Sequence, residues 1–134
     1  MVGIDVLLWI YSFFGALGGM ARYGVSVIVP DGLFPWHTLI VNLVGSFLLG
    51  FAVSYLQSRK IFSQAFISGI GTGFIGTFTT FSTFSMETIQ LLEAGHVGLA
   101  MTYGIISAVA GLVLAFYGFS ISARLQRRRT LHVD

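Results

Sequence analysis

The stretch Gly69–Glu87, GIGTGFIGTFTTFSTFSME, decides the fold, because it is apolar enough to lie in a membrane and yet carries the features that break a helix. Its first eight residues include four glycines, and alternating aromatic and hydroxyl side chains follow them. Glycine weakens a helix, and Ser and Thr hydroxyls offer alternative partners to freed backbone groups. The sequence therefore predicts a helix that breaks near Gly76 to Thr80.

The composition of the whole chain indicates an integral membrane protein. Only 9% of its 134 residues are charged and 55% are hydrophobic, and its mean hydropathy is +0.88, whereas globular proteins are about 25% charged. So little charge excludes a soluble enzyme, a protein that reads nucleic-acid bases and a disordered tail. Cysteine is absent, and His37, His96 and His132 have no metal-ligand spacing, so we expect no bound transition metal.

Four segments are long and apolar enough to cross a bilayer, whose core of about 30 Å needs about 20 residues. They span residues 4–29, 38–56, 64–92 and 99–123, and Pro30 and Pro35 stop the first of them. We therefore expect an all-α membrane protein with four transmembrane helices, the third broken near its middle. Residues 1–134 then form a single four-span membrane domain.

The basic residues predict how the chain is oriented. An even number of spans brings both termini and the loop at residues 57–63 to one side of the membrane. That side carries six basic residues: Arg59, Lys60, Arg124, Arg127, Arg128 and Arg129. The opposite loops carry none, so the positive-inside rule predicts cytoplasmic termini, with a basic cytoplasmic tail at 124–134. We expect the chain in the cell inner (plasma) membrane.

Two ionisable residues lie inside the expected spans, Arg22 in the first and Glu87 near the end of the third. Charges in a membrane are costly and often functional. Both could reach the interface on the non-cytoplasmic side as anchors. Alternatively they line an aqueous vestibule, where Arg22 would raise the local concentration of an anion.

Neutral polar and small residues form stripes on two other spans. The second span carries Asn42, Gly45, Ser46 and Gly50, and the fourth carries Tyr103, Ser107 and Gly111. Small residues also let membrane helices pack, as in the pairs Gly15/Gly19, Gly69/Gly73 and Gly104/Ala108. Asn42 is harder to explain by packing, because an amide in hydrocarbon must find hydrogen-bond partners.

The expected break is a candidate ion site. Non-helical backbone at membrane depth survives where it is buried in protein or lines a cavity, and it leaves backbone groups free for ions. Carbonyl and hydroxyl oxygens suit a small cation, whereas N–H and O–H donors suit an anion. Phe81 and Phe84 lie three residues apart, and the positive edges of their rings could stabilise an anion. Thirteen Phe residues nevertheless make some regular spacing inevitable.

Taken together, these residues resemble the Fluc/CrcB family of fluoride channels over essentially the whole chain. The most specific matches are the run from Gly73 to Ser85 followed by Glu87, and the motif Thr38-Leu-Ile-Val-Asn42. Gly18-Gly-Met-Ala-Arg22-Tyr resembles the first-helix signature of the family, and Tyr103 with Ser107 resembles its fourth helix.

The resemblance implies a dimer of antiparallel subunits with two fluoride pores and a central structural sodium ion. Backbone carbonyls of Gly76 and Thr79 would bind the sodium ion. Phe81 and Phe84 would line each pore and Asn42 would supply a side-chain donor. Further polar contacts would come from Thr80, Ser82, Thr83, Tyr103 and Ser107.

The function that the resemblance implies is passive, fluoride-selective export from the cytoplasm, which protects the cell from fluoride, with no enzymatic activity. The residues also allow a small cation channel or transporter, or a structural membrane subunit. A membrane-embedded enzyme is disfavoured, because no pair of carboxylates or His residues converges in the spans. The biased basic residues leave two assemblies open, an antiparallel homodimer or a heterodimer with an oppositely oriented paralogue.

Overall fold

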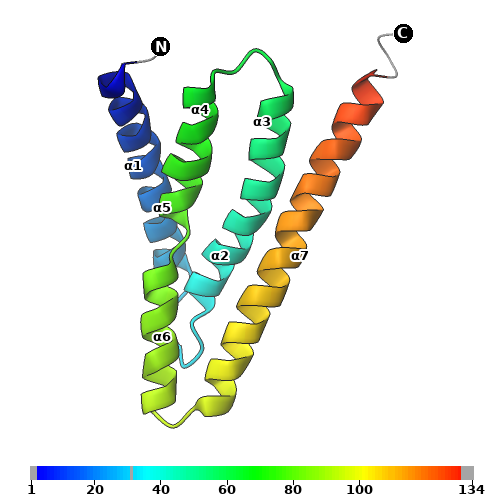
Figure 1. Cartoon of the computed structure of the whole chain (residues 1–134). Coiled ribbons are helices and arrows are strands. Elements are labelled where there is room, and N and C mark those ends of the chain that lie inside the picture. Colours follow the sequence, from blue (N-terminus) through cyan, green and yellow to red (C-terminus); the bar gives the residue numbers. More distant parts are fainter. Residues whose placement is uncertain (1–2, 31, 131–134) are drawn as a thin grey trace.

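The computed structural model describes residues 3–30 and 32–130, which form helices and the connections between them, without a strand (Figure 1). Asp31, His132 and the rest of the segment 131–134 lie outside the described residues. The helical elements in chain order are α1 (Ile4–Ile28), α2 (Trp36–Leu48), η1 (Leu49–Val53), α3 (Ser54–Ser58), α4 (Gln64–Ser68), η2 (Gly69–Ile75), α5 (Gly76–Phe78), α6 (Phe81–Glu93) and α7 (Val97–Thr130). The two η elements are π-helical segments within longer helices.

Among the described residues, three helices are long and apolar enough to cross a membrane: Ile4–Ile28, Trp36–Ser58 and Val97–Arg129. Their large apolar side chains face outward, and Trp9 and Phe116 are 77% and 71% exposed. The fourth expected span consists of two shorter helical stretches, α4 to α5 and then α6. The chain is therefore an all-helical membrane protein whose third apolar segment is divided.

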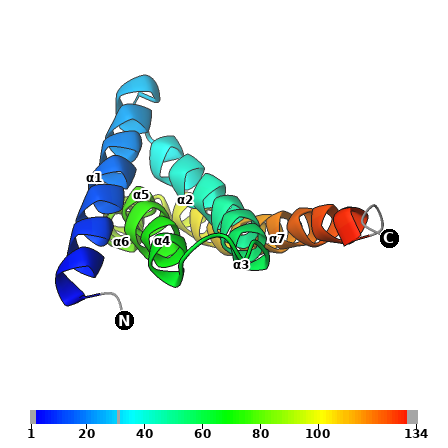
Figure 2. The ribbon, with the colours of Figure 1, turned by 90° about the horizontal axis from the view of Figure 1, so that it is seen from above.

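The ends of the helices alternate as expected for an even number of passes. Figure 1 shows the start of α1, the end of α7 and the connection between α3 and α4 at one end of the molecule. The turn between α6 and α7 lies at the other end. Seen from above, α1 and α7 lie on opposite sides, with the other helices between them (Figure 2).

Two boundaries differ from those expected. The second helix begins at Trp36, so His37 lies in its first turn instead of in a loop. The last helix continues to Thr130 instead of ending at residue 123. Arg, Leu and Gln are good helix formers, and neither Gly nor Pro follows Gly118, so nothing in the sequence ends the helix earlier.

Glycines allow α1 to pack closely against η2 and α5. A Cβ atom added at Gly18 would collide with the carbonyl oxygen of Phe74, and one at Gly69 would lie 2.8 Å from the ring of Phe14. A Cβ atom at Gly73 would lie 3.0 Å from Cβ of Phe14. The glycine-rich segment thus stays helical and serves helix packing.

The other expected small-residue pairs behave differently. An added Cβ at Gly15 would lie 3.5 Å from Thr77, but one at Gly19 or Gly104 would have no neighbour within 4 Å in the described part of the chain. Gly19 and Gly104 therefore do not act as packing positions within one chain. On the opposite side, Gly118 and Gly50 let α7 approach the second helix.

Gly18 and its neighbour Gly19 give a matched test of this packing. Gly18→Ala should destabilise the protein by about 1–3 kcal/mol, because the new methyl group meets a backbone carbonyl that cannot move aside easily. Gly19→Ala should be neutral or slightly stabilising, because alanine favours a helix. Thermal unfolding of the purified protein in detergent measures both, and equal midpoints for the two variants would contradict the packing assignment.

Candidate functional site

The third apolar segment leaves the helix at Thr79 and Thr80. Thr79 has φ −80° and ψ 162°, and Thr80 has φ −149° and ψ 123°. Both residues are extended, so α5 ends and α6 begins on either side of them. This position lies at the end of the range expected from the sequence, beyond the glycines and within the hydroxyl residues.

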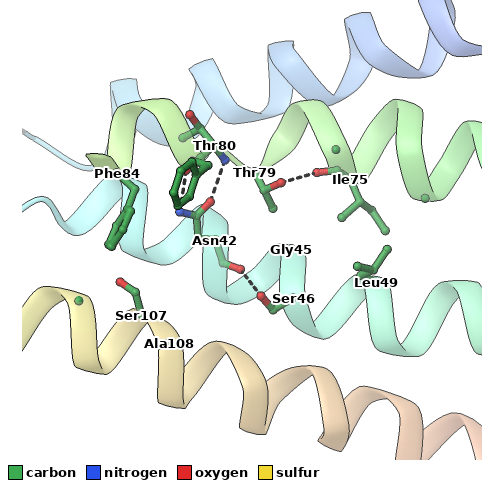
Figure 3. A pocket seen from close by; sticks show the side chains of 14 residues that line it. Asn42, Gly45, Ser46, Leu49, Ile75, Thr79, Thr80, Phe84, Ser107 and Ala108 are labelled. Atoms are coloured by element: carbon green, nitrogen blue, oxygen red, sulfur yellow. Dashed lines mark hydrogen bonds between the residues drawn. The ribbon is translucent and has the colours of Figure 1, made fainter. Parts of the chain in front are cut away.

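Asn42 of α2 lies beside the break and binds its backbone through the side-chain amide (Figure 3). Its amide nitrogen donates to the carbonyl oxygen of Thr80 at 2.9 Å. The backbone N–H of Thr80 donates in return to the amide oxygen of Asn42 at 2.8 Å. This pairing replaces hydrogen bonds that the helix would have supplied, which matters because an unpaired backbone group in hydrocarbon is costly. One amide hydrogen of Asn42 is not used by this pairing.

Threonine hydroxyls complete the local hydrogen bonding. The Thr80 hydroxyl caps α6 by accepting from the backbone N–H of Thr83 at 3.2 Å, and it donates to the Thr83 hydroxyl at 2.9 Å. The Thr79 hydroxyl donates to the carbonyl of Ile75 at 3.0 Å. The Thr77 hydroxyl donates to the carbonyl of Gly15 at 2.8 Å and so ties α5 to α1.

A groove of about 460 Å³ runs beside the break, between α2, α6 and α7 (Figure 3). It contains seven of the site residues that the resemblance implies: Asn42, Gly76, Thr79, Thr80, Phe81, Phe84 and Ser107. The hydroxyl oxygen of Ser107 is buried there without a hydrogen-bond partner among the described residues. A buried hydroxyl without a partner is costly. The groove therefore offers an unused donor to whatever occupies it.

The two phenylalanines of the groove differ in how they are held. Their ring centroids lie 6.0 Å apart. Phe84 also packs on Tyr103 with centroids 4.9 Å apart, whereas Phe81 is 80% exposed. One ring is fixed inside the chain, and the other faces outward at the edge of the groove.

Glu87 is held between helices instead of reaching the interface alone. Thr38 donates its hydroxyl to one carboxylate oxygen at 2.8 Å, and Tyr103 donates to the other at 2.8 Å. Both donors are fully buried. The ring of His37 lies 3.5 Å from the first oxygen, and the Glu87 side chain is 15% exposed. The carboxylate thus joins α2, α6 and α7 at one end of the groove.

The remaining predicted residues lie outside the groove. Thr83 and Arg22 line a crevice of about 190 Å³ between α1 and α2. Glu87 and Thr83 line another of about 470 Å³ beside α6. Ser82 is exposed, with its hydroxyl 3.4 Å from that of Thr80, and Tyr103 is buried.

The comparisons with known proteins concern the chain as a whole. The family model described as CrcB-like protein, Camphor Resistance (CrcB), matches residues 9–119. The chain belongs to the CrcB family. The match runs from α1 into α7, so it contains every residue of the groove and of the Glu87 cluster.

Curated relatives of this CrcB-family chain carry functional names. A protein of Listeria innocua serovar 6a named fluoride-specific ion channel FluC 2 is 50% identical over 123 residues, which cover 92% of this chain and 95% of the relative. Fluoride-specific ion channel FluC 1 of Desulfitobacterium hafniense is 45% identical over 82% of this chain and 97% of its own length. Fluoride-specific ion channel FluC 1 of Bacillus cereus is 40% identical over 90% of each chain.

Sequence reasoning gave no role to two residues that the structure joins to Glu87 in this CrcB chain, His37 and Thr38, although Thr38 begins a motif of the resemblance. A signal for Thr38 was present, because Thr38, Asn42 and Ser46 recur every four residues on one helix face. His37 gave no such signal, since its role depends on a carboxylate fifty residues later in the chain.

Replacement of Asn42 tests whether this pairing stabilises the break. Asn42→Ala should lower the free energy of unfolding by about 2–4 kcal/mol, because it leaves two backbone groups of Thr80 unpaired. Ser46→Ala is the control, since the Ser46 hydroxyl only bonds the carbonyl of Asn42 within the same helix. Thermal unfolding in detergent checks both variants, and an Asn42→Ala protein as stable as Ser46→Ala would contradict the assignment.

Proposed function

We propose that this chain is a passive, fluoride-selective ion channel that exports fluoride from the cytoplasm and so protects the cell. It performs no covalent chemistry. The observation that carries the proposal is the membership of the chain in a family whose close relatives bear the name fluoride-specific ion channel. The groove beside the break supports it, because its polar groups are neutral donors instead of charged side chains.

The groove is suited to a small, strongly hydrated anion that must exchange its water shell for protein donors. The remaining amide hydrogen of Asn42 and the unpartnered hydroxyl of Ser107 supply such donors. The rings of Phe81 and Phe84 line the groove, and the positive edge of an aromatic ring attracts an anion. Neutral donors hold the ion weakly enough for it to leave, as conduction requires. Arg22 and Glu87 line the two crevices outside the groove, which form the vestibule of the channel.

We further propose that a structural sodium ion binds at the same break, to the backbone carbonyls of Gly76 and Thr79. The carbonyls at the end of α5 carry the negative end of the helix dipole. Gly76 is exposed and lines the groove. No Asp or Glu occurs between Asp31 and Glu87, so carbonyl oxygens would have to supply the negative potential.

We propose that the channel is an antiparallel dimer. Phe81 is 80% exposed at the edge of the groove, and an added Cβ at Gly104 has no neighbour within 4 Å in the described chain. This surface is open to a second subunit, which would close the groove into a pore. Six basic residues lie in the loop and tail of one side, whereas the loops of the other side carry none. The partner is therefore either an identical chain or an oppositely oriented paralogue in the inner membrane. Relatives named FluC 1 and FluC 2 make a paralogue a reasonable partner.

A small cation channel or transporter could use the same Thr and carbonyl oxygens, and ion efflux separates the two functions. Liposomes containing the protein and loaded with potassium fluoride should release fluoride, whereas liposomes loaded with potassium chloride should retain chloride. Ser107→Ala should lower fluoride efflux about tenfold, the effect of losing one donor to an anion. Its thermal stability should not fall, because the hydroxyl has no partner in the folded chain. Potassium release without fluoride release would favour the cation channel.

The sodium ion has a test of its own. Fluoride efflux should require sodium during purification and reconstitution, because a structural ion completes the folded dimer. It should not change when a sodium gradient is imposed afterwards, because an embedded ion is not transported. Fluoride-selective electrode recordings measure both, with protein exchanged into potassium or N-methylglucamine salts as the control. A steep dependence on the sodium gradient would instead make the protein a coupled transporter.

A further inference from the structure

His37 and Glu87 form an imidazole–carboxylate pair, and the fluoride pathway described above gives His37 no role. Nε2 of His37 lies 3.5 Å from Oε1 of Glu87 and 3.1 Å from the hydroxyl oxygen of Thr38. The two side chains are 20% and 15% exposed. They are thus largely enclosed by protein but still within reach of water and protons.

The pair lies where ions would enter. His37 lines the crevice of about 190 Å³ that also contains Arg22 and Thr80. It also lines the crevice of about 470 Å³ that contains Glu87. Thr80 belongs both to the first crevice and to the groove at the break. His37 thus lines both crevices, and the smaller of them extends to Thr80 at the edge of the groove.

We propose that His37 and Glu87 form a proton-binding site at this mouth of the channel, and that protonation of His37 increases fluoride flux. The proposal rests on the proposed function as a fluoride channel. A neutral imidazole leaves the negative charge of Glu87 uncompensated, and this charge opposes the approach of an anion. An imidazolium cancels that charge and adds an N–H donor facing the crevice. Imidazole makes this change near pH 6.5.

The other charged and titratable groups around the pair do not replace His37. Arg22 of α1, whose guanidinium is a permanent cation, and Tyr23 of α1 line the smaller crevice. Tyr103 of α7 donates its hydroxyl to Glu87. His96 lines the larger crevice, but it is exposed and forms no ion pair with Glu87 in the described part of the chain. His96 therefore serves as a matched control, an imidazole that lines the same crevice without meeting Glu87.

Fluoride efflux from liposomes with equal pH on both sides tests the proposal for either orientation of the subunits. We compare the wild-type protein, His37→Gln and His96→Gln at pH 7.5 and 5.5, and subtract efflux from protein-free liposomes, which reports leakage of hydrofluoric acid. Wild-type and His96→Gln flux should rise about fivefold on acidification, the effect of one charge compensated in a partly hydrated pocket. For His37→Gln the ratio of the two rates should be close to one.

An equal rise in His37→Gln, or a wild-type flux that falls with acidification, would overturn the proposal. A second measurement is independent of transport and applies even if His37→Gln does not fold. The ring signals of His37 in nuclear magnetic resonance spectra of the wild-type protein should titrate at a different pH once Glu87 is replaced by Gln, while those of His96 should not change. Absence of fluoride flux at both pH values would refute the proposed function, and an unchanged His37 titration would refute the pair.

Discussion

The structure depends on the two hydrogen bonds between the Asn42 side chain and the backbone of Thr80. A helix that breaks inside a membrane exposes N–H and C=O groups that water cannot reach, and only protein groups can bind them. A primary amide is suited to this position, because it donates and accepts at the same time. With Thr80 fixed, its hydroxyl caps α6, and α6 in turn carries Phe81, Phe84 and Glu87. One side chain on α2 thus positions the far half of another apolar segment.

Sequence reasoning located this break well because its signal is local. A long apolar segment rich in Gly, Ser and Thr indicates where a helix is weak, and the break falls within the expected range. The sequence did not indicate whether the helix would break at the glycines or at the hydroxyl residues. The glycines of Gly69–Ile75 remain helical because α1 packs against them, so the backbone opens at the threonines, where side-chain hydroxyls can bind it. The outcome depends on a neighbouring helix and cannot be read from this segment alone.

The candidate site was predictable as a set of residues but not as an arrangement. Long apolar runs identified the spans, spacing of three and four residues identified their polar faces, and seven of the site residues implied by the resemblance do meet in one groove. Tyr103 and Glu87 meet elsewhere, in a cluster with Thr38 and His37. Such contacts join residues that are 16 to 50 positions apart, and the spacing of residues along one helix cannot predict them. α7 is longer than the expected span for a different reason. The basic residues mark where the span leaves the membrane, but they do not end the helix.

The length of α7 also determines how deeply the protein sits in the bilayer. A helix of 34 residues rises about 51 Å at 1.5 Å per residue, about 20 Å more than the hydrocarbon core. Arg124, Arg127 and Arg128 occupy its final turns and cannot enter that core without losing their water. These arginines therefore oppose movement of α7 along its axis toward the bilayer centre. A reporter protein joined after residue 130 would stand on a stiff helical stalk, clear of the lipid surface.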